Sequence, residues 1–130
     1  MDDLLAWLYE YCSQHKIGIR FINYLDSNAP SVCYKLPRMI IYNEKWHDQQ
    51  EQPFILAHEI GHIMCGTTIC YHNQGIQISK NKSECDANTF AINLLSKYCE
   101  ENDICFDNKY QFATAFGIPN RCFYLLEKVS

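Results

Sequence analysis

Residues 52–65 carry two histidines and a glutamate within an otherwise apolar helical pattern, and no other feature constrains the chain as strongly. His58 and His62 are four residues apart, so on an α-helix their side chains lie on one face, about 6 Å apart along the axis. Leu56 and Ile60 predict that this helix faces the core, where buried polar side chains cost free energy unless they have partners. A metal ion is the simplest partner, because two imidazoles at this spacing can both reach one Zn²⁺.

Glu59 completes an H-E-x-x-H motif with the two histidines. It follows His58 directly and is therefore turned about 100° from it, so it can contact a metal-bound water without binding the metal. In that position a carboxylate acts as a general base. A structural metal site needs no base and usually has four protein ligands. The motif thus favours a catalytic zinc site over a regulatory protein that binds metal without cleaving peptides, which is the alternative.

A catalytic zinc needs a third protein ligand, and residues 83–91 offer three candidates. Glu84 is favoured, because Asn88 is four residues further on the same helical face and could orient one of the histidines. Asp86 lies about 200° around the helix from Glu84, so both cannot easily face one metal. Cys85 is a soft-ligand alternative. The spacing leaves all three open, with Glu84 preferred.

Composition and charge narrow the functional class. The chain has 130 residues, 48% of them hydrophobic, and a net charge of −4. It is long enough for one core-forming domain, expected to span residues 1–130. Its net negative charge argues against electrostatic binding to nucleic acid or to an anionic membrane. The acidic start of the chain and the lack of a long apolar run predict a soluble cytoplasmic protein, whose oligomeric state the sequence leaves open.

Eight cysteines are present, at positions 12, 33, 65, 70, 85, 99, 105 and 122. None of them forms a C-x-x-C pair of the kind that structural zinc sites and redox motifs usually contain. In a reducing compartment they are expected to be buried free thiols that act as small hydrophobic side chains.

Periodicity and turn signals predict an α+β fold with a small sheet early in the chain and helices after it. The expected elements are a helix over 3–15, strands over 17–22, 32–36 and 39–42, a helix from Pro53 to Cys65, an irregular connection over 67–81 with a short strand at 76–78, a helix from the capping box 81–84 to Tyr98, and a C-terminal helical pair within 108–130. The strand over 39–43 could pair with an extended substrate. In the pair, one helix ends at Gly117 and the next starts at Pro119.

The two motifs together resemble those of the ImmA/IrrE metallopeptidases. In that family H-E-[ILF]-[GA]-H is followed by E-x-E-A-N-x-F-A-x-x-L-L, and this chain has His58–His62 and then Glu84-x-Asp86-Ala87-Asn88-x-Phe90-Ala91-x-x-Leu94-Leu95. The segments 40–43 and 54–57 also fit, so the resemblance covers about residues 1–100. Asp86 replaces a usual Glu, and Ser96-Lys97 replaces a frequent Pro; neither departure touches the inferred ligands.

This resemblance implies a zincin-like fold, a small twisted sheet packed on helices with the H-E-x-x-H helix at the active site. It implies that His58, His62 and Glu84 bind Zn²⁺ and that Glu59 is the general base. It further implies a protein substrate, a helix-turn-helix transcriptional repressor of a mobile element or a stress response, with cleavage releasing repression.

Two further features carry weaker hypotheses. Tyr71 and His72 follow the zinc helix and are the nearest candidates to stabilise the oxyanion, but the favoured interpretation is that both are ordinary loop residues. Residues 112–123 have the spacing of a helix-turn-helix, which would suit a DNA-associated protein. The second helix of that segment carries few basic residues, so two packed helices without nucleic acid are favoured.

Overall fold

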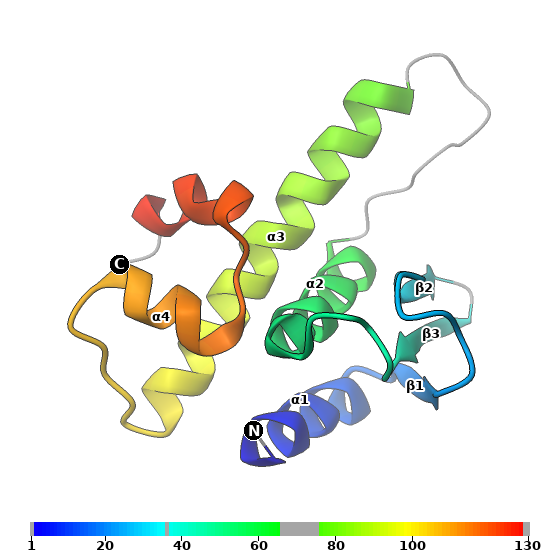
Figure 1. The fold of residues 1–130 in the computed structure, drawn as a ribbon, viewed down its shortest axis with the longest axis horizontal. Coiled ribbons are helices and arrows are strands. Elements are labelled where there is room, and N and C mark those ends of the chain that lie inside the picture. The colour runs from blue at the N-terminus through cyan, green and yellow to red at the C-terminus, as the bar shows by residue number, and fades with distance from the viewer. Residues whose placement is uncertain (1, 36, 66–75, 129–130) are drawn as a thin grey trace.

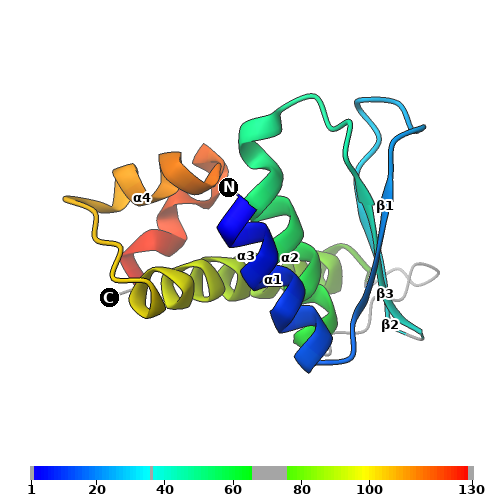
Figure 2. The same cartoon turned by 90° about the horizontal axis from the view of Figure 1, so that it is seen from below.

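A computed structural model of the chain describes residues 2–35, 37–65 and 76–128. A small sheet lies at one side of the molecule and the C-terminal helices lie at the other. The helix Gln52–Met64, which carries both histidines, lies between them (Figures 1 and 2). The elements are, in chain order, α1 (Asp2–Gln14), β1 (Gly18–Ile22), β2 (Val32–Lys35), β3 (Arg38–Asn43), the 3-10 turn η1 (Gln49–Glu51), α2 (Gln52–Met64), α3 (Ile76–Glu101), α4 (Lys109–Phe116) and the 3-10 helix η2 (Asn120–Lys128).

The sheet has three strands in the order β1-β3-β2. β1 runs parallel to β3, with Gly18 opposite Met39, and β2 runs antiparallel to β3, with Val32 opposite Ile41. Pro37 lies in the turn between β2 and β3, where its missing N–H costs no ladder hydrogen bond. β3 is hydrogen-bonded on both sides. The hypothesis that residues 39–43 pair with a substrate is therefore wrong; β1 and β2 are the edge strands of the described sheet.

α2 is the central element of the core, because it packs against the sheet, α1 and α3 (Figure 2). A helix covered on several sides is apolar around most of its circumference, and nine of its thirteen residues are buried. The most deeply buried large side chains come from every layer: Leu8, Ile40, Leu56, Ile60, Ile92, Leu95 and Leu125. The result is a mixed α+β fold with a small sheet packed on helices, consistent with a zincin-like fold.

α3 differs from the sequence-based expectation at its start. The helix begins at Ile76, so the predicted strand at 76–78 is helical and the predicted capping box at 81–84 lies inside the helix. Asn81 and Ser83 are common at helix starts, because their side chains can accept hydrogen bonds from free backbone N–H groups. Here they continue a helix that has already formed, and the polar character of this stretch gave no apolar periodicity to reveal it.

The C-terminal segment forms the two short helices that were expected. Asn108 caps α4 by accepting hydrogen bonds from the backbone N–H groups of Tyr110 and Gln111, and Gly117 ends it in the left-handed conformation, with φ of 71°. η2 follows Pro119 and packs against α3 with Cys122, Leu125 and Leu126 buried. None of the described helices combines the length and the apolar character needed to cross a membrane. The seven cysteines in the described ranges hold no disulfide.

Candidate metal centre and cleft

α2 presents the two histidines side by side, as the four-residue spacing requires. The Nε2 atoms of His58 and His62 lie 3.1 Å apart, and the two rings are almost perpendicular. Both side chains are largely buried, with 15% and 10% of their surfaces exposed. Two imidazole nitrogens thus face one point from a rigid helix.

α3 brings a carboxylate to the same point. Oε2 of Glu84 lies 3.1 Å from Nε2 of His58, and Oε1 lies 3.0 Å from Nε2 of His62. The donor atoms of the three side chains all lie within 4.8 Å of one another. Of the three candidates considered for the third position, Glu84 is the one that joins the histidines; in the described part of the chain neither Cys85 nor Asp86 belongs to a group of this kind.

The approach of α3 to α2 depends on Gly61. A Cβ atom at this position would come within 2.7 Å of the Ala87 carbonyl oxygen and 3.0 Å of the Ala87 Cα atom. Those atoms belong to the backbone of α3 and cannot move aside by a rotamer change. Since Ala87 is three residues from Glu84, the missing side chain at Gly61 helps to set the distance of that carboxylate from the histidines.

Glu84 and His58 each shift the pKa of the other in the direction that favours the charged form. Burial is the largest single influence on the pKa of His58 and lowers it, but the hydrogen bond with Glu84, the charges of Glu59 and Glu84, and a contact with Asn88 together raise it. The same contacts from both histidines hold the pKa of Glu84 well below its usual range. Glu84 is therefore ionised at neutral pH. Two imidazoles and one carboxylate that converge in this way are a donor set that fits a divalent metal such as Zn²⁺.

Asn88 was predicted to orient one of the histidines. The amide lies close enough to His58 to help raise its pKa. The Nδ1 atom of His58 is nevertheless buried without a hydrogen-bond partner. The orienting role of Asn88 therefore stays a prediction.

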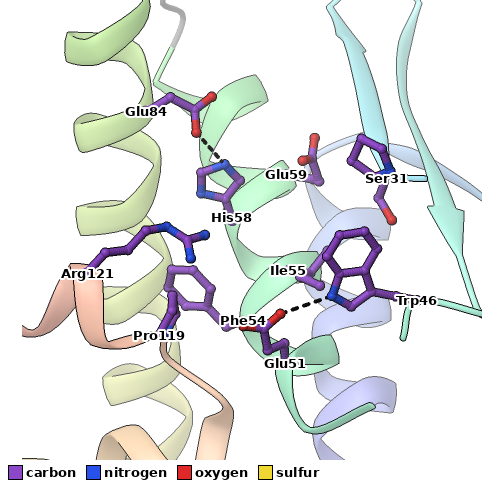
Figure 3. Close-up of a pocket in the computed structure, with 11 residues that line it drawn as sticks. Ser31, Trp46, Glu51, Phe54, Ile55, His58, Glu59, Glu84, Pro119 and Arg121 are labelled. Carbon is purple, nitrogen blue, oxygen red and sulfur yellow. Dashed lines mark hydrogen bonds and ion pairs between the residues drawn. The ribbon is translucent and has the colours of Figure 1, made fainter. Parts of the chain in front are cut away.

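Glu59 lies beside this group and is turned toward the sheet (Figure 3). Only 8% of its surface is exposed. Burial is the main reason why its pKa is raised, and a hydrogen bond with the Cys33 side chain, from β2, partly opposes that shift. A carboxylate with a raised pKa is a better proton acceptor near neutral pH than a fully solvated one.

A cleft of about 430 Å³ opens along this side of α2. His58, Glu59 and Glu84 line the cleft, together with apolar side chains from several segments (Figure 3). Its remaining walls are Pro30, Ser31, Trp46, Glu51, Phe54, Ile55, Pro119 and Arg121. The Trp46 indole N–H donates a hydrogen bond of 3.0 Å to Glu51, which holds that wall in place.

The sequence did not predict most of the residues that line the cleft. Ser31, Trp46 and Arg121 come from three separate segments, and no spacing rule connects them to the H-E-x-x-H motif. The proposed oxyanion donors Tyr71 and His72 lie outside the described residues.

Comparison with protein families gives one match. The model of peptidase family M78, described as the IrrE N-terminal-like domain, matches residues 12–124 of the chain. Neither the curated proteins nor the solved structures include a significant match. The family match covers α2, α3 and most of η2, and therefore every residue that lines the metal centre.

Proposed function

The chain belongs to the family of IrrE N-terminal-like domains, a peptidase family, and on this premise we propose that it is a zinc-dependent endopeptidase. His58, His62 and Glu84 are the proposed zinc ligands, and Glu59 is the proposed general base. The convergence of three donor atoms within 4.8 Å, from two helices, is the observation that carries the proposal. Three protein ligands leave one position free, as a catalytic zinc requires.

The chemistry follows from the positions of these side chains. A bound Zn²⁺ would supply an acidified water and polarise the carbonyl of the scissile peptide bond. Glu59 accepts one proton from the attacking water while the water oxygen bonds to the carbonyl carbon. It then returns that proton to the leaving nitrogen as the C–N bond breaks. The products are a carboxyl group and an amine.

The free edge of β2 offers a place for an extended segment of a protein substrate. Within the described residues no strand pairs with the outer edge of β2, and Val32 and Tyr34 are exposed on that strand. A substrate strand that adds to β2 would run past Cys33, the partner of Glu59. We assign strand addition to β2 rather than to β3. A helix-turn-helix repressor remains the proposed substrate, on the resemblance alone, and residues 1–130 are proposed to act as one domain.

The direct test compares the wild type with Glu59→Gln and His62→Ala. Glu59→Gln removes the base but keeps the size of the side chain, so zinc content and fold are expected to stay intact. Cleavage is expected to fall by about 10²–10⁴. His62→Ala should lose both zinc and cleavage, because it removes a ligand. The measurements are elemental analysis, thermal unfolding, and mass spectrometry of new termini in a complex peptide mixture.

Two results would contradict the proposal. Wild-type cleavage by Glu59→Gln would reject the role of Glu59. Full zinc occupancy in His62→Ala would reject the ligand set. A protein that binds zinc through these ligands but cleaves neither peptides nor a repressor would instead be the regulatory metal-binding protein considered above.

A further inference from the structure

Arg121 is the one arginine or lysine among the described residues that line the cleft. It belongs to η2, and its side chain extends from that helix toward His58 (Figure 3). No carboxylate of the described ranges lies within ion-pair distance of it. Arg121 and Glu84 also line a neighbouring hollow of about 370 Å³, so both side chains stand where the two spaces meet. A guanidinium without an acidic partner in this position is available to a ligand.

Arg121 and Glu59 lie on opposite sides of His58. Figure 3 shows Glu59 on the side of the sheet and Arg121 on the side of η2. Both side chains line the same cleft as His58 and Glu84. We expect a peptide bond bound at the metal centre to lie between them. The two groups therefore face a substrate carbonyl from opposite directions.

Charge moves across this cleft during the proposed reaction. Before the attack, the negative charge is on the Glu59 carboxylate. When Glu59 takes a proton from water and the water oxygen bonds to the carbonyl carbon, one electron pair of the C=O bond moves to the carbonyl oxygen. The negative charge thus leaves the side of the sheet and appears on an oxygen that a cation on the opposite wall can approach. Such a cation stabilises the transition state more than the ground state.

We propose that Arg121 is this cation and that its guanidinium donates hydrogen bonds to the oxyanion of the tetrahedral intermediate. Arginine suits the position, because it stays charged at any working pH and presents several N–H donors in a fixed plane. The inference rests on the proposed endopeptidase function. It assigns the oxyanion-stabilising role, for which the sequence offered Tyr71 and His72 only as the nearest candidates, to a residue far along the chain.

The test uses two blocked Phe–Leu pseudopeptides of equal length and zinc-loaded protein. One carries an anionic phosphinyl group at the scissile position and resembles the oxyanion; the other carries a neutral hydroxyethylene group. We expect Arg121→Ala to weaken phosphinyl binding by about 10²–10³, as the loss of one oxyanion donor does to kcat, and to change hydroxyethylene binding little. Arg121→Lys should fall between, because it keeps the charge but not the planar donors.

Arg20→Ala is the matched control, since it removes an exposed arginine from β1, which does not line the cleft. Zinc content and circular dichroism of all variants should match the wild type. With a peptide that the wild type cleaves, Arg121→Ala should lower kcat by a similar factor and leave KM nearly unchanged.

Calorimetry of pseudopeptide binding distinguishes a failure of this inference from a failure of the proposed function. If the wild type holds zinc and binds both compounds, but Arg121→Ala binds them as Arg20→Ala does, the inference is overturned and the endopeptidase proposal stands. If Arg121→Ala loses affinity only for a third pseudopeptide with a glutamate side chain, Arg121 recognises a standing carboxylate and the inference is again overturned. A wild type without zinc and without affinity for either compound would overturn the proposed function and this inference together.

Discussion

Asn43 shows how a single side chain can hold the walls of a cleft that it does not line. It is 1% exposed, at the end of β3. Its amide N–H groups donate to the carbonyl oxygens of Asp26 and Ala29, at 2.9 and 2.8 Å, and its Oδ1 accepts from the backbone N–H of Lys45 at 3.0 Å. Its own backbone N–H donates to the Ser31 hydroxyl. Asn43 thereby joins the segments that carry Ser31 and Trp46.

We expect Asn43→Ala to lower the free energy of unfolding by about 2–4 kcal/mol, because it removes three hydrogen bonds from a buried position. Activity should respond mainly through KM, since the walls shift while the zinc ligands on α2 and α3 stay in place. Urea unfolding and steady-state kinetics measure the two effects. Asn28→Ala, at an exposed position nearby, is the control and should change stability by less than about 0.5 kcal/mol. Equal stability of the two variants would contradict the argument.

At the scale of elements, the pair α2–α3 makes the metal centre, and at Gly61 the two helices lie too close for a side chain. Gly61→Val should destabilise the fold by about 3 kcal/mol or more, because the added carbon atoms meet the backbone of α3. Zinc affinity should fall as well, since α3 also carries Glu84. Chemical denaturation and competition with a zinc chelator test both effects.

Gly18→Val is the matched control for Gly61→Val. Gly18 lies in β1, where a Cβ atom would make only ordinary contacts and where a β-branched side chain is favoured. This variant should keep wild-type stability and zinc affinity. A Gly61→Val protein that behaves like Gly18→Val would show that the helices can separate without cost to the centre.

The same helix pair shows what sequence can and cannot predict. Periodicity placed His58 and His62 on one face of a helix, because residues four apart are about one turn apart. Ligand type and the resemblance favoured Glu84 on the next helix, but no spacing rule fixed it there. The start of α3 was missed, because Ile76 and Ile78 alternate with a polar residue as in a strand, and the following polar stretch contains typical capping residues. Arg121 and Trp46 were missed because contacts between distant segments leave no local pattern. Local geometry was predictable; the cleft, which depends on tertiary packing, was not.

At the scale of the whole molecule, a metal on His58, His62 and Glu84 would join α2 to α3. The first of these helices packs on the sheet and the second packs against η2. Binding to the folded state alone adds about 4 kcal/mol when free zinc is 1,000-fold above its Kd. We therefore expect a chelator to lower the Tm by about 10–20 °C in a chain of this size. Calorimetry with and without chelator measures the shift. The Tm of His62→Ala should not respond to chelator; a response there would locate the stabilising metal elsewhere.

The cysteines report on the packing of the whole molecule. Burial raises the pKa of the Cys12 thiol to about 12, so its thiolate fraction at neutral pH falls more than ~10³-fold below that of an ordinary cysteine. Cys105 is exposed. A short iodoacetamide pulse followed by peptide mapping should label Cys105 and leave Cys12 unlabelled until the protein is unfolded. Labelling of both at one rate would mean that α1 does not pack as described, and recovery of disulfides after lysis would contradict the expectation of a reducing compartment.

The order of the elements along the chain also sets the order in which the parts of the site emerge during synthesis on the ribosome. Glu84 follows the two histidines after only 22 residues, whereas the wall that carries Arg121 lies near the far end of the chain. At 5–20 residues per second, about 2–7 s separate the emergence of Glu84 from that of Arg121. A nascent chain can thus assemble the metal ligands before the cleft has its second wall. If Arg121 acts as proposed, the nascent protein has little peptidase activity until η2 has been translated.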